Sequence, residues 1–345
     1  MRKLLLSMFA ALALLGCDKE HTPIAPIEPG VIGFGNVTTR AVDSADDIDE
    51  FPVWACMADP SADYYAPILT NERVYKGSKG EWTYDNTRLW VDNSHFFFFS
   101  VFSDVEDYPL FTEYKFDPEE NGRQYIVYAL DYVTPATADF DILAAYNYTN
   151  TINEGYSKIV SMQFTHLLTK FNIKIEQDFN KSPDFDYYIK KVTLSGVKSE
   201  GVYLAMPRVD GLYSGWSFGD EPTFATFEKS FVDAPVRLRN TDPNVANKKI
   251  VLTVFEEDGL LLIPQEIAAN TIRLRIDYYY DVDTSDSDMG VERYVEVYLP
   301  TSPLWEPNKI ITYKLAISEQ TDIKFLAPTI ESWGSPQTGG TIIIK

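Results

Sequence analysis

Cys17, near the start of this 345-residue chain, has the residue type and setting for covalent lipid attachment. It closes the sequence Leu14-Leu15-Gly16-Cys17, which matches a bacterial lipobox, in which the thiol is acylated and becomes the new N-terminus. Arg2 and Lys3 precede an apolar run of about a dozen residues, shorter than the ~20 residues of a membrane-spanning helix. We therefore predict a lipoprotein signal peptide over residues 1–17, with Cys17 as the lipid site.

Arg40 and Ala41 form a second reactive position, because a basic residue there opens into a polar, acidic run that a protease can reach. The preceding residues 31–38 have the pattern of a short strand with Ile32 and Phe34 on one face. A strand that ends at an exposed cleavage site can be removed. Its loss from a β-sandwich uncovers unpaired backbone groups and an apolar floor, which an extended segment of another chain can fill. We predict that residues 18–40 are a propeptide carrying this first strand.

Residues 339–345 have the composition of such a filling segment. Successive side chains of a strand point to opposite faces, so Ile342 and Ile344 share one side of an extended run, as Ile32 and Phe34 do. Either pair fits the same two pockets. The sequence therefore predicts a strand-exchange subunit without enzymatic activity, and the predicted donor strand consists of Thr341, Ile342, Ile343 and Ile344.

The acidic loop 281–292 has the oxygen ligands of an EF-hand at positions 1, 3, 5 and 12. Asp286, however, stands where the sharp turn of that loop requires glycine, and strand-like sequences flank the loop where helices belong. A solvated hairpin loop is the favoured interpretation, and loose calcium binding is the alternative. We predict no metal site and no cofactor.

His166 and Cys56 are the other residues whose side chains could take part in a reaction, and we interpret both as structural. No Gly-x-Ser-x-Gly motif occurs, so we interpret His166 as a packed, hydrogen-bonded core residue rather than a catalytic base. Cys56 lies in an apolar strand-like run and is interpreted as a buried thiol. With Cys17 committed to lipid, Cys56 has no disulfide partner, and the chain must be stabilised by its core.

Paired tyrosines raise the question of sugar binding. Tyr64-Tyr65 and Tyr187-Tyr188 could stack on a sugar ring, but in β-rich domains such residues more often pack across strands.

The net charge of −21 disfavours nucleic acid as a partner. The chain contains 22 Tyr, 21 Phe and 6 Trp, enough apolar area for two cores of ordinary domain size.

Short runs of β-branched and aromatic residues, separated by turn sequences, indicate an all-β protein of antiparallel sandwiches. Only residues 165–170 suggest a short helical turn. We place a boundary near residue 165, which gives a first domain over 41–165 and a second over 166–345. The predicted strands are 87–91, 96–102, 124–131, 142–148, 159–164, 170–176, 190–194, 201–206, 249–255, 260–264, 271–280, 293–299, 310–317 and 341–344.

Several local patterns together resemble the fimbrillin-like family, the subunits of lipoprotein-derived type V pili of Gram-negative bacteria. The lipobox and the Thr38-Thr39-Arg40-Ala41 site come first, followed by Phe164-Thr165-His166 and by Leu261-Leu262-Ile263-Pro264-Gln265. Trp305-Glu306-Pro307-Asn308-Lys309 resembles a further family segment, although Ile311 stands where an aromatic residue is common. The patterns occur in the family's order and span most of the chain.

The resemblance implies two tandem transthyretin-like β-sandwiches, export as an outer-membrane lipoprotein and cleavage between Arg40 and Ala41 by an arginine-specific surface protease. Removal of residues 31–38, with Ile32 and Phe34, then admits the 341–344 strand of another pilus subunit, and the product is a fimbrium at the cell surface that also has a role in adhesion.

Two questions stay open at this level. The subunit can be a stalk, tip or anchor component, and residues 341–344 can be a donor or a fixed edge strand of the second sandwich. The alternative function is a monomeric outer-membrane glycan-binding lipoprotein that keeps its lipid and its first strand. A hydrolase ranks third, because no paired carboxylates and no triad can be assigned.

Overall fold

Every regular element in the computed structural model is a β-strand, which confirms the predicted all-β class for the described part of the chain. No helix that is long and apolar enough to cross a membrane is found among the described residues. The short helical turn predicted over 165–170 is wrong, because a bend at 167–168 joins two paired strands there. The structure describes residues 30–39, 48–58, 65–103, 113–120, 123–139, 141–152, 155, 157–180, 185–208, 211–240, 242, 244, 249–255, 259–281, 291–318 and 322–333.

Four consecutive phenylalanines in β5 (His95–Ser103) show how the first half of the chain is built. Because side chains alternate along a strand, Phe96 and Phe98 enter one apolar cluster while Phe97 and Phe99 enter another. The strand is therefore buried on both faces. The described residues form three apolar clusters, where composition had suggested two cores.

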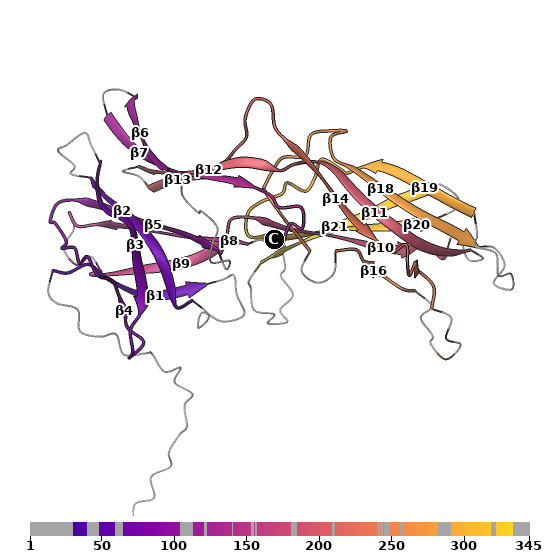
Figure 1. Ribbon diagram of the computed structural model, residues 1–345, viewed down its shortest axis with the longest axis horizontal. Coiled ribbons are helices and arrows are strands. Elements are labelled where there is room, and N and C mark those ends of the chain that lie inside the picture. Colours follow the sequence, from indigo (N-terminus) through magenta and orange to yellow (C-terminus); the bar gives the residue numbers. More distant parts are fainter. Residues whose placement is uncertain are drawn as a thin grey trace, which may run out of the picture.

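Seven strands close into a ring that we call the barrel sheet (left side of Figure 1). In spatial order they are β1 (Gly33–Thr39), β4 (Trp82–Thr83), β3 (Tyr65–Lys76), β2 (Glu50–Ala58), β5, β8 (Ile142–Asn150) and β9 (Ile159–His166). β1 pairs with both β4 and β9, and these two contacts complete the ring. The apolar cluster that we call the barrel core includes Ile32, Phe34, Phe51, Val53, Val74, Phe96, Phe98, Val160, Met162 and Phe164.

A second sheet, the covering sheet, packs against the barrel sheet. A cluster of buried side chains joins Cys56, Phe97 and Phe99 of the barrel sheet to Tyr128 and Tyr203 of the covering sheet. Two of its strands come from the half of the chain after residue 165, so this sheet combines both halves. The division into 41–165 and 166–345 remains a prediction. The covering sheet has the order β13 (Gly211–Ser217), β12 (Glu200–Arg208), β7 (Arg123–Val133) and β6 (Glu113–Glu120).

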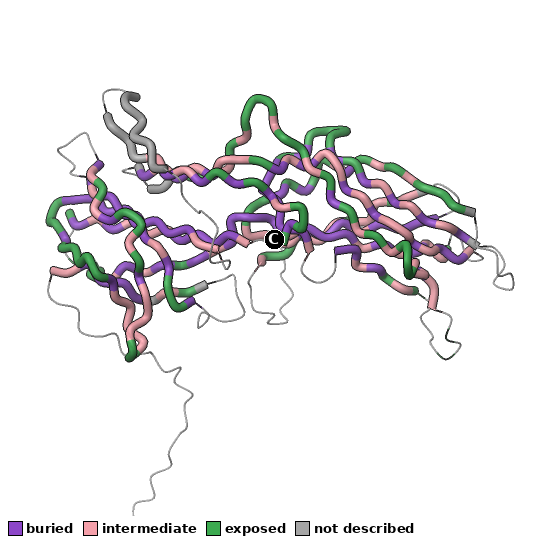
Figure 2. The backbone as a smooth tube through the Cα atoms, in the orientation of Figure 1, coloured by how far each residue is buried: buried purple, intermediate pink, exposed green. Residues whose placement is uncertain are grey.

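Two further sheets share the third apolar cluster and form what we call the second unit (right side of Figure 1). Purple buried stretches run along their facing strands in Figure 2. The β10 sheet contains β16 (Leu252–Thr253), β17 (Leu260–Leu262), β10 (Thr169–Gln177), β20 (Lys309–Ser318) and β21 (Asp322–Ser332). The β11 sheet contains β14 (Phe224–Ser230), β15 (Val236–Arg237), β11 (Asp186–Lys198), β18 (Arg273–Asp281) and β19 (Val291–Tyr298).

Among the described strands the pairing is antiparallel except at two places, which corrects the prediction of antiparallel sheets. β1 runs parallel to β9, and β10 runs parallel to β20. In each case a strand early in its unit lies beside a late one that runs in the same direction. Local sequence cannot reveal such a pairing, because both partners are short apolar runs far apart in the chain.

Some predicted strands are shorter or missing. Residues 87–91 form only an isolated bridge between Leu89 and Val31, because the backbone there pairs with the start of β1. The run 249–255 keeps only the two residues of β16. The strands β3, β13, β14 and β21 were not predicted, since polar or small residues interrupt their apolar pattern, and neither were the two-residue strands β4 and β15 or the strand β6, which contains charged residues and a proline.

Candidate functional site

β1 is the seam that closes the barrel sheet. It pairs with β9 from Gly33 opposite Ile159 to Thr39 opposite Phe164, with a register shift between Gly35 and Thr38. Its pairing with β4 consists of Phe34 opposite Trp82 alone. One interrupted ladder and one short contact therefore hold the seam, and its removal opens the ring. We call the space that it fills the β1 slot.

The side chains of Ile32 and Phe34 fill the barrel core, on one face as the sequence predicted. Ile32 is fully buried and Phe34 is 2% exposed. The Phe34 ring lies edge-on to Tyr84, Phe98 and Phe51, with centroid distances of 5.4, 5.9 and 6.4 Å. Such edge-to-face contacts add about 0.5–1.5 kcal/mol each to the effect of burial. The loss of β1 therefore exposes an apolar, aromatic floor.

The start of β1 is anchored by the segment that runs from Tyr84 to Trp90. The amide of Ile32 donates to the carbonyl of Arg88 at 2.8 Å, and the amide of Trp90 donates to the carbonyl of Gly30 at 2.8 Å. The Tyr84 hydroxyl donates to the Ile32 carbonyl at 2.9 Å and accepts a bond from the Arg88 amide at 3.0 Å. Burial raises the pKa of Tyr84, so the hydroxyl keeps its proton and remains a donor.

His166 is the last residue of β9. We call residues 166–170, where β9 passes into β10, the joint. His166 Nδ1 is 2.6 Å from Oδ2 of Asp141, and the side chain is 2% exposed. These contacts confirm the interpretation as a packed, hydrogen-bonded core residue. Asp141 lies 25 residues upstream, a spacing that no sequence motif marks.

Trp333, the last described residue, is stacked on His166 at the joint. Their ring centroids are 3.3 Å apart and the planes differ by 7°. The Trp333 amide donates to the carbonyl of Asn308 at 3.1 Å, and the Asn308 amide donates to the carbonyl of Leu168 at 3.0 Å. The end of β21 is thus fixed beside the end of β9.

Several predicted site residues lie outside the described residues. They are the lipid site Cys17, both sides of the scissile bond (Arg40 and Ala41) and the predicted donor strand Thr341, Ile342, Ile343 and Ile344. Their roles remain predictions. The described part of β1 ends at Thr39, immediately before Arg40.

The loop that resembles an EF-hand joins the two strands of a hairpin. β18 and β19 pair with Tyr280 opposite Val291, so strands flank the loop as predicted. Residues 282–290 lie outside the described residues. No group of three or more His, Cys, Asp or Glu that could hold a metal ion occurs within the described part.

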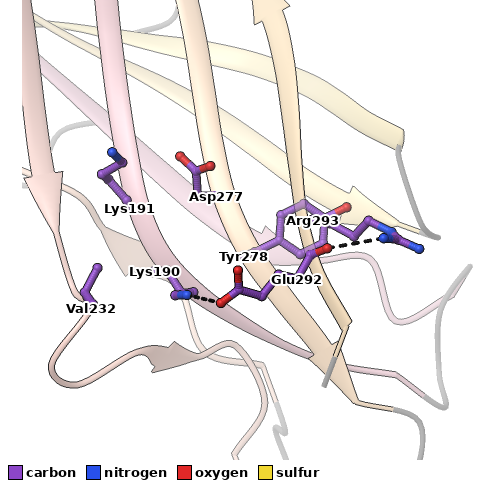
Figure 3. Close-up of a pocket in the computed structure, with 7 residues that line it drawn as sticks. All are labelled: Lys190, Lys191, Val232, Asp277, Tyr278, Glu292 and Arg293. Atoms are coloured by element: carbon purple, nitrogen blue, oxygen red, sulfur yellow. Dashed lines mark hydrogen bonds and ion pairs between the residues drawn. The ribbon is translucent and has the colours of Figure 1, made fainter. Parts of the chain in front are cut away.

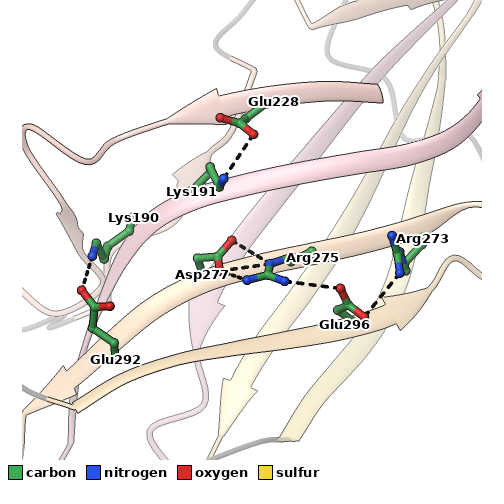
Figure 4. A network of polar contacts seen from close by, with 8 residues as sticks. All are labelled: Lys190, Lys191, Glu228, Arg273, Arg275, Asp277, Glu292 and Glu296. Carbon is green, nitrogen blue, oxygen red and sulfur yellow. Dashed lines mark hydrogen bonds and ion pairs between the residues drawn. The ribbon is translucent and has the colours of Figure 1, made fainter. Parts of the chain in front are cut away.

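A hollow of about 190 Å³ opens on the outer face of the β11 sheet (Figure 3). Its charged groups bind one another: Lys190 forms an ion pair with Glu292, and Arg293 Nη1 donates to the Glu292 carbonyl at 3.3 Å. Figure 4 shows a separate set of contacts on the same sheet, in which Arg275 contacts Asp277 at 2.6 Å. Both lysines of the lining are paired with a carboxylate, Lys190 with Glu292 and Lys191 with Glu228. The lining residues are Lys190, Lys191, Val232, Asp277, Tyr278, Glu292 and Arg293.

The described members of the tyrosine pairs, Tyr65, Tyr187 and Tyr188, pack on other aromatic residues, which was the favoured interpretation, whereas Tyr64 lies outside the described residues. Tyr65 is 7% exposed and contacts Phe97 at a centroid distance of 5.6 Å. Tyr187 is 1% exposed, and Tyr188 stacks on Tyr279 at 4.5 Å. Cys56 is fully buried, and burial raises the pKa of its thiol to about 12, so it is not a reactive thiolate.

Sequence reasoning missed the groups that hold the seam and the joint. Tyr84, Trp90 and Asp141 act through contacts with residues 25 to 68 positions away. The one sequence feature that indicated these contacts was the concentration of aromatic residues between Trp82 and Trp90, because a surface loop does not need so many apolar side chains.

These features define an all-β protein with a barrel sheet that is closed by its first strand and joined to a second two-sheet unit. The model of one protein family, described as Fimbrillin-like, matches residues 39–333. The chain belongs to this family, as its resemblance in sequence indicated. It is accordingly a fimbrial, cell-adhesion protein of the cell surface rather than an enzyme.

Solved structures of low sequence identity match this chain, and the first of them shares its fold. A fimbrial protein from Bacteroides vulgatus is 17% identical with a TM-score of 0.61, and the match covers 88% of this chain and 99% of that one. A putative cell adhesion protein from Bacteroides uniformis is 16% identical, with a TM-score of 0.44 and coverage of 89% and 100%. The tip fimbrial protein Mfa3 from Porphyromonas gingivalis, with C-terminal truncation, is 9% identical, with a TM-score of 0.34 and coverage of 86% and 97%. A search of curated proteins found no significant match.

Proposed function

We propose that this protein is a pilus subunit that polymerises by strand exchange after proteolysis. Cys17 carries the lipid that holds the precursor at the outer membrane, and an arginine-specific surface protease cuts between Arg40 and Ala41. β1 then leaves, and residues 341–344 of another subunit enter the β1 slot. The two tandem units are transthyretin-like sandwiches in this proposal.

The observation that carries the proposal is the position of β1. It is the seam of a closed sheet, it precedes Arg40 directly, and the core contacts of Ile32 and Phe34 can be replaced by another apolar pair. Burial of two such side chains contributes roughly 3–6 kcal/mol, to which ladder bonds add about 0.5–1.5 kcal/mol each. An incoming strand with Ile342 and Ile344 gains a similar amount, so exchange is nearly neutral until cleavage lets β1 depart.

Limited trypsin digestion of the purified, folded protein tests the proposal. We expect a main cut that gives a new N-terminus at Ala41, loss of the fragment that carries β1, and ladders on a gel that lengthen with protein concentration. Arg40→Gln is the control and should give neither the cut nor ladders. A cleaved protein that stays monomeric at every concentration would favour the glycan-binding lipoprotein instead.

The donor assignment is tested separately by substitutions within residues 341–344. Ile342→Asn with Ile344→Asn places two polar groups on the face predicted to enter the slot, and should abolish ladders while each monomer stays folded. Ile343→Asn is the matched control, because its side chain lies on the opposite face. Equal loss of ladders in both variants would contradict the proposed two-pocket recognition.

A further inference from the structure

The end of the β1 slot lies beside the root of the segment 334–345. Thr39, at the end of β1, is opposite Phe164, and His166 is two residues further along β9. Trp333 is stacked on His166, and its amide is bonded to Asn308. Residues 334–345 therefore start from a fixed point near the end of the slot where β1 finishes.

From this geometry we propose that residues 334–345 fill the β1 slot of their own chain once β1 has left, in the direction opposite to β1. The inference rests on the proposed function, because it requires that β1 departs after cleavage. Starting near His166, the segment would run antiparallel to β9. Antiparallel pairs are slightly more stable per residue than parallel ones, so the reversed direction does not weaken the ladder with β9. Only the single residue pair with β4 would change from antiparallel to parallel.

The length of the segment suits this path. Twelve residues span at most about 40 Å when extended, whereas the eight residues of β9 cover about 26 Å. The part of the segment that is longer than β9 is needed to pass from the joint into the slot. The segment therefore reaches the far end of the slot, where Phe34 is opposite Val160.

The apolar residues fall at matching positions. Ile342 lies nine residues after Trp333, whereas Val160 lies six residues before His166, so three residues remain for the turn into the slot. With that turn, Ile342 comes opposite Val160 in the place of Phe34. Ile344, two residues on, then takes the place of Ile32 beside Lys158. The pair thus occupies the same two pockets in either direction of the strand.

The tether gives self-closure an advantage over donation between copies. A segment joined to its site by a short linker has an effective concentration in the millimolar range, which exceeds a micromolar neighbour by about 10³-fold. A cleaved subunit is then closed while dilute and exchanges strands with a neighbour when subunits are concentrated. Self-closure would protect the barrel core in the interval between cleavage and assembly.

Peptide binding to cleaved protein tests the inference. A labelled synthetic peptide of residues 334–345 is titrated into two cleaved proteins, the full chain and a variant that lacks 334–345. Both are kept dilute enough to be monomeric by size-exclusion chromatography, and mass spectrometry verifies that residues 18–40 are gone. We expect the truncated protein to bind the peptide, and the full chain to bind it about 10²–10³-fold more weakly because its slot is filled.

The outcomes separate the two proposals. Equal affinity for both proteins would overturn self-closure and leave donation between subunits intact. Absence of binding to the truncated protein, folded by circular dichroism, would overturn the proposed function as well. A peptide with Ile342→Asn and Ile344→Asn should not bind, and one with Ile343→Asn should. Hydrogen exchange gives a second measurement: the amides of residues 159–164 should exchange slowly in the dilute full chain and rapidly in the truncated protein, and equal rates would overturn self-closure.

Discussion

The first strand of the barrel sheet and the first strand of the second unit are held in different ways. Both lie parallel to a late strand, β1 beside β9 and β10 beside β20. β10, however, pairs with β20 along all of its residues, from Thr169 to Gln177, and its other edge pairs with β16 and β17. β1 has one ladder, which a register shift interrupts, and a single residue pair on its other side.

The two strands also differ in their connections. β10 continues from β9 through the bend at 167–168, so cleavage at one point cannot release it. β1 ends next to Arg40, so the proposed cut after that residue would separate it covalently from the strands that follow. Under the proposed function, the same kind of parallel pairing is therefore permanent in one unit and removable in the other.

The largest expected effect comes from removing a buried aromatic ring from each of these strands. Phe34→Ala and Phe171→Ala should each lower the free energy of unfolding of the uncut protein by about 3–5 kcal/mol. After cleavage and release of β1, only Phe171→Ala should still destabilise, because Phe34 has left. Urea unfolding before and after trypsin measures both. If Phe34→Ala stayed destabilising in protein that lacks residues 18–40, β1 would not be a separable element.

The contrast between the two strands also shows how far the sequence predicts this fold. The alternation around Ile32 and Phe34 and the four phenylalanines of β5 predicted buried strands, and both are buried. Strand direction was not predictable, since β1 and β10 have ordinary apolar alternation and their parallel partners are more than a hundred residues away. Turn sequences specify only local antiparallel hairpins.

The joint was also beyond sequence analysis. The pattern around His166 was noticed, but its partners Asp141 and Trp333 come from positions 25 residues before and 167 residues after it. Only the folded chain brings these side chains together. Local patterns therefore predicted which residues are buried, and not which distant elements they join.

The next effect in size is an alkaline loss of stability that starts at a different pH in each unit. The folded pKa of Cys56, in the cluster under the covering sheet, is raised by burial from 9.0 to about 12, and that of Tyr278, in the second unit, from 10.0 to about 12. At a pH between the ordinary pKa and the raised pKa of either group, the unfolded chain has released a proton that the folded chain keeps. Stability should therefore fall by about 1.4 kcal/mol per pH unit for each group, above pH 9 for Cys56 and above pH 10 for Tyr278.

Cys56→Ala and Tyr278→Phe separate these contributions. Cys56→Ala should remove the decline that begins near pH 9, and Tyr278→Phe should leave that part and reduce the slope above pH 10. Chemical unfolding at pH 8, 9, 10 and 11 gives the slope of the free energy of unfolding against pH. A substitution that destabilises the protein equally at every pH does not change this slope. An unchanged slope between pH 9 and 10 in Cys56→Ala would contradict the assignment.

A smaller effect is expected from the hydroxyl that anchors the seam. Tyr84→Phe removes the bond to the Ile32 carbonyl and the acceptor for the Arg88 amide, and should lower the stability of the uncut protein by about 0.5–1.5 kcal/mol. The effect should be smaller after β1 leaves, since one of the two partners is gone. Tyr313→Phe is the control in the second unit, because its hydroxyl contacts Trp305 Nε1 at 3.4 Å and its effect should be the same before and after cleavage.

The smallest effect is expected on the outer face of the β11 sheet. Asp277 binds Arg275 at 2.6 Å near the surface, and exposed ion pairs of this kind contribute less than about 1 kcal/mol and weaken with salt. Asp277→Asn should therefore change the melting temperature slightly at low salt, and equally before and after cleavage. Glu228→Gln, which breaks the 3.3 Å pair with Lys191, is a matched control on the same face. A large loss of stability, or one that depends on cleavage, would mean that the stability of the second unit depends on the presence of β1. The two strands β1 and β10 would then not act independently.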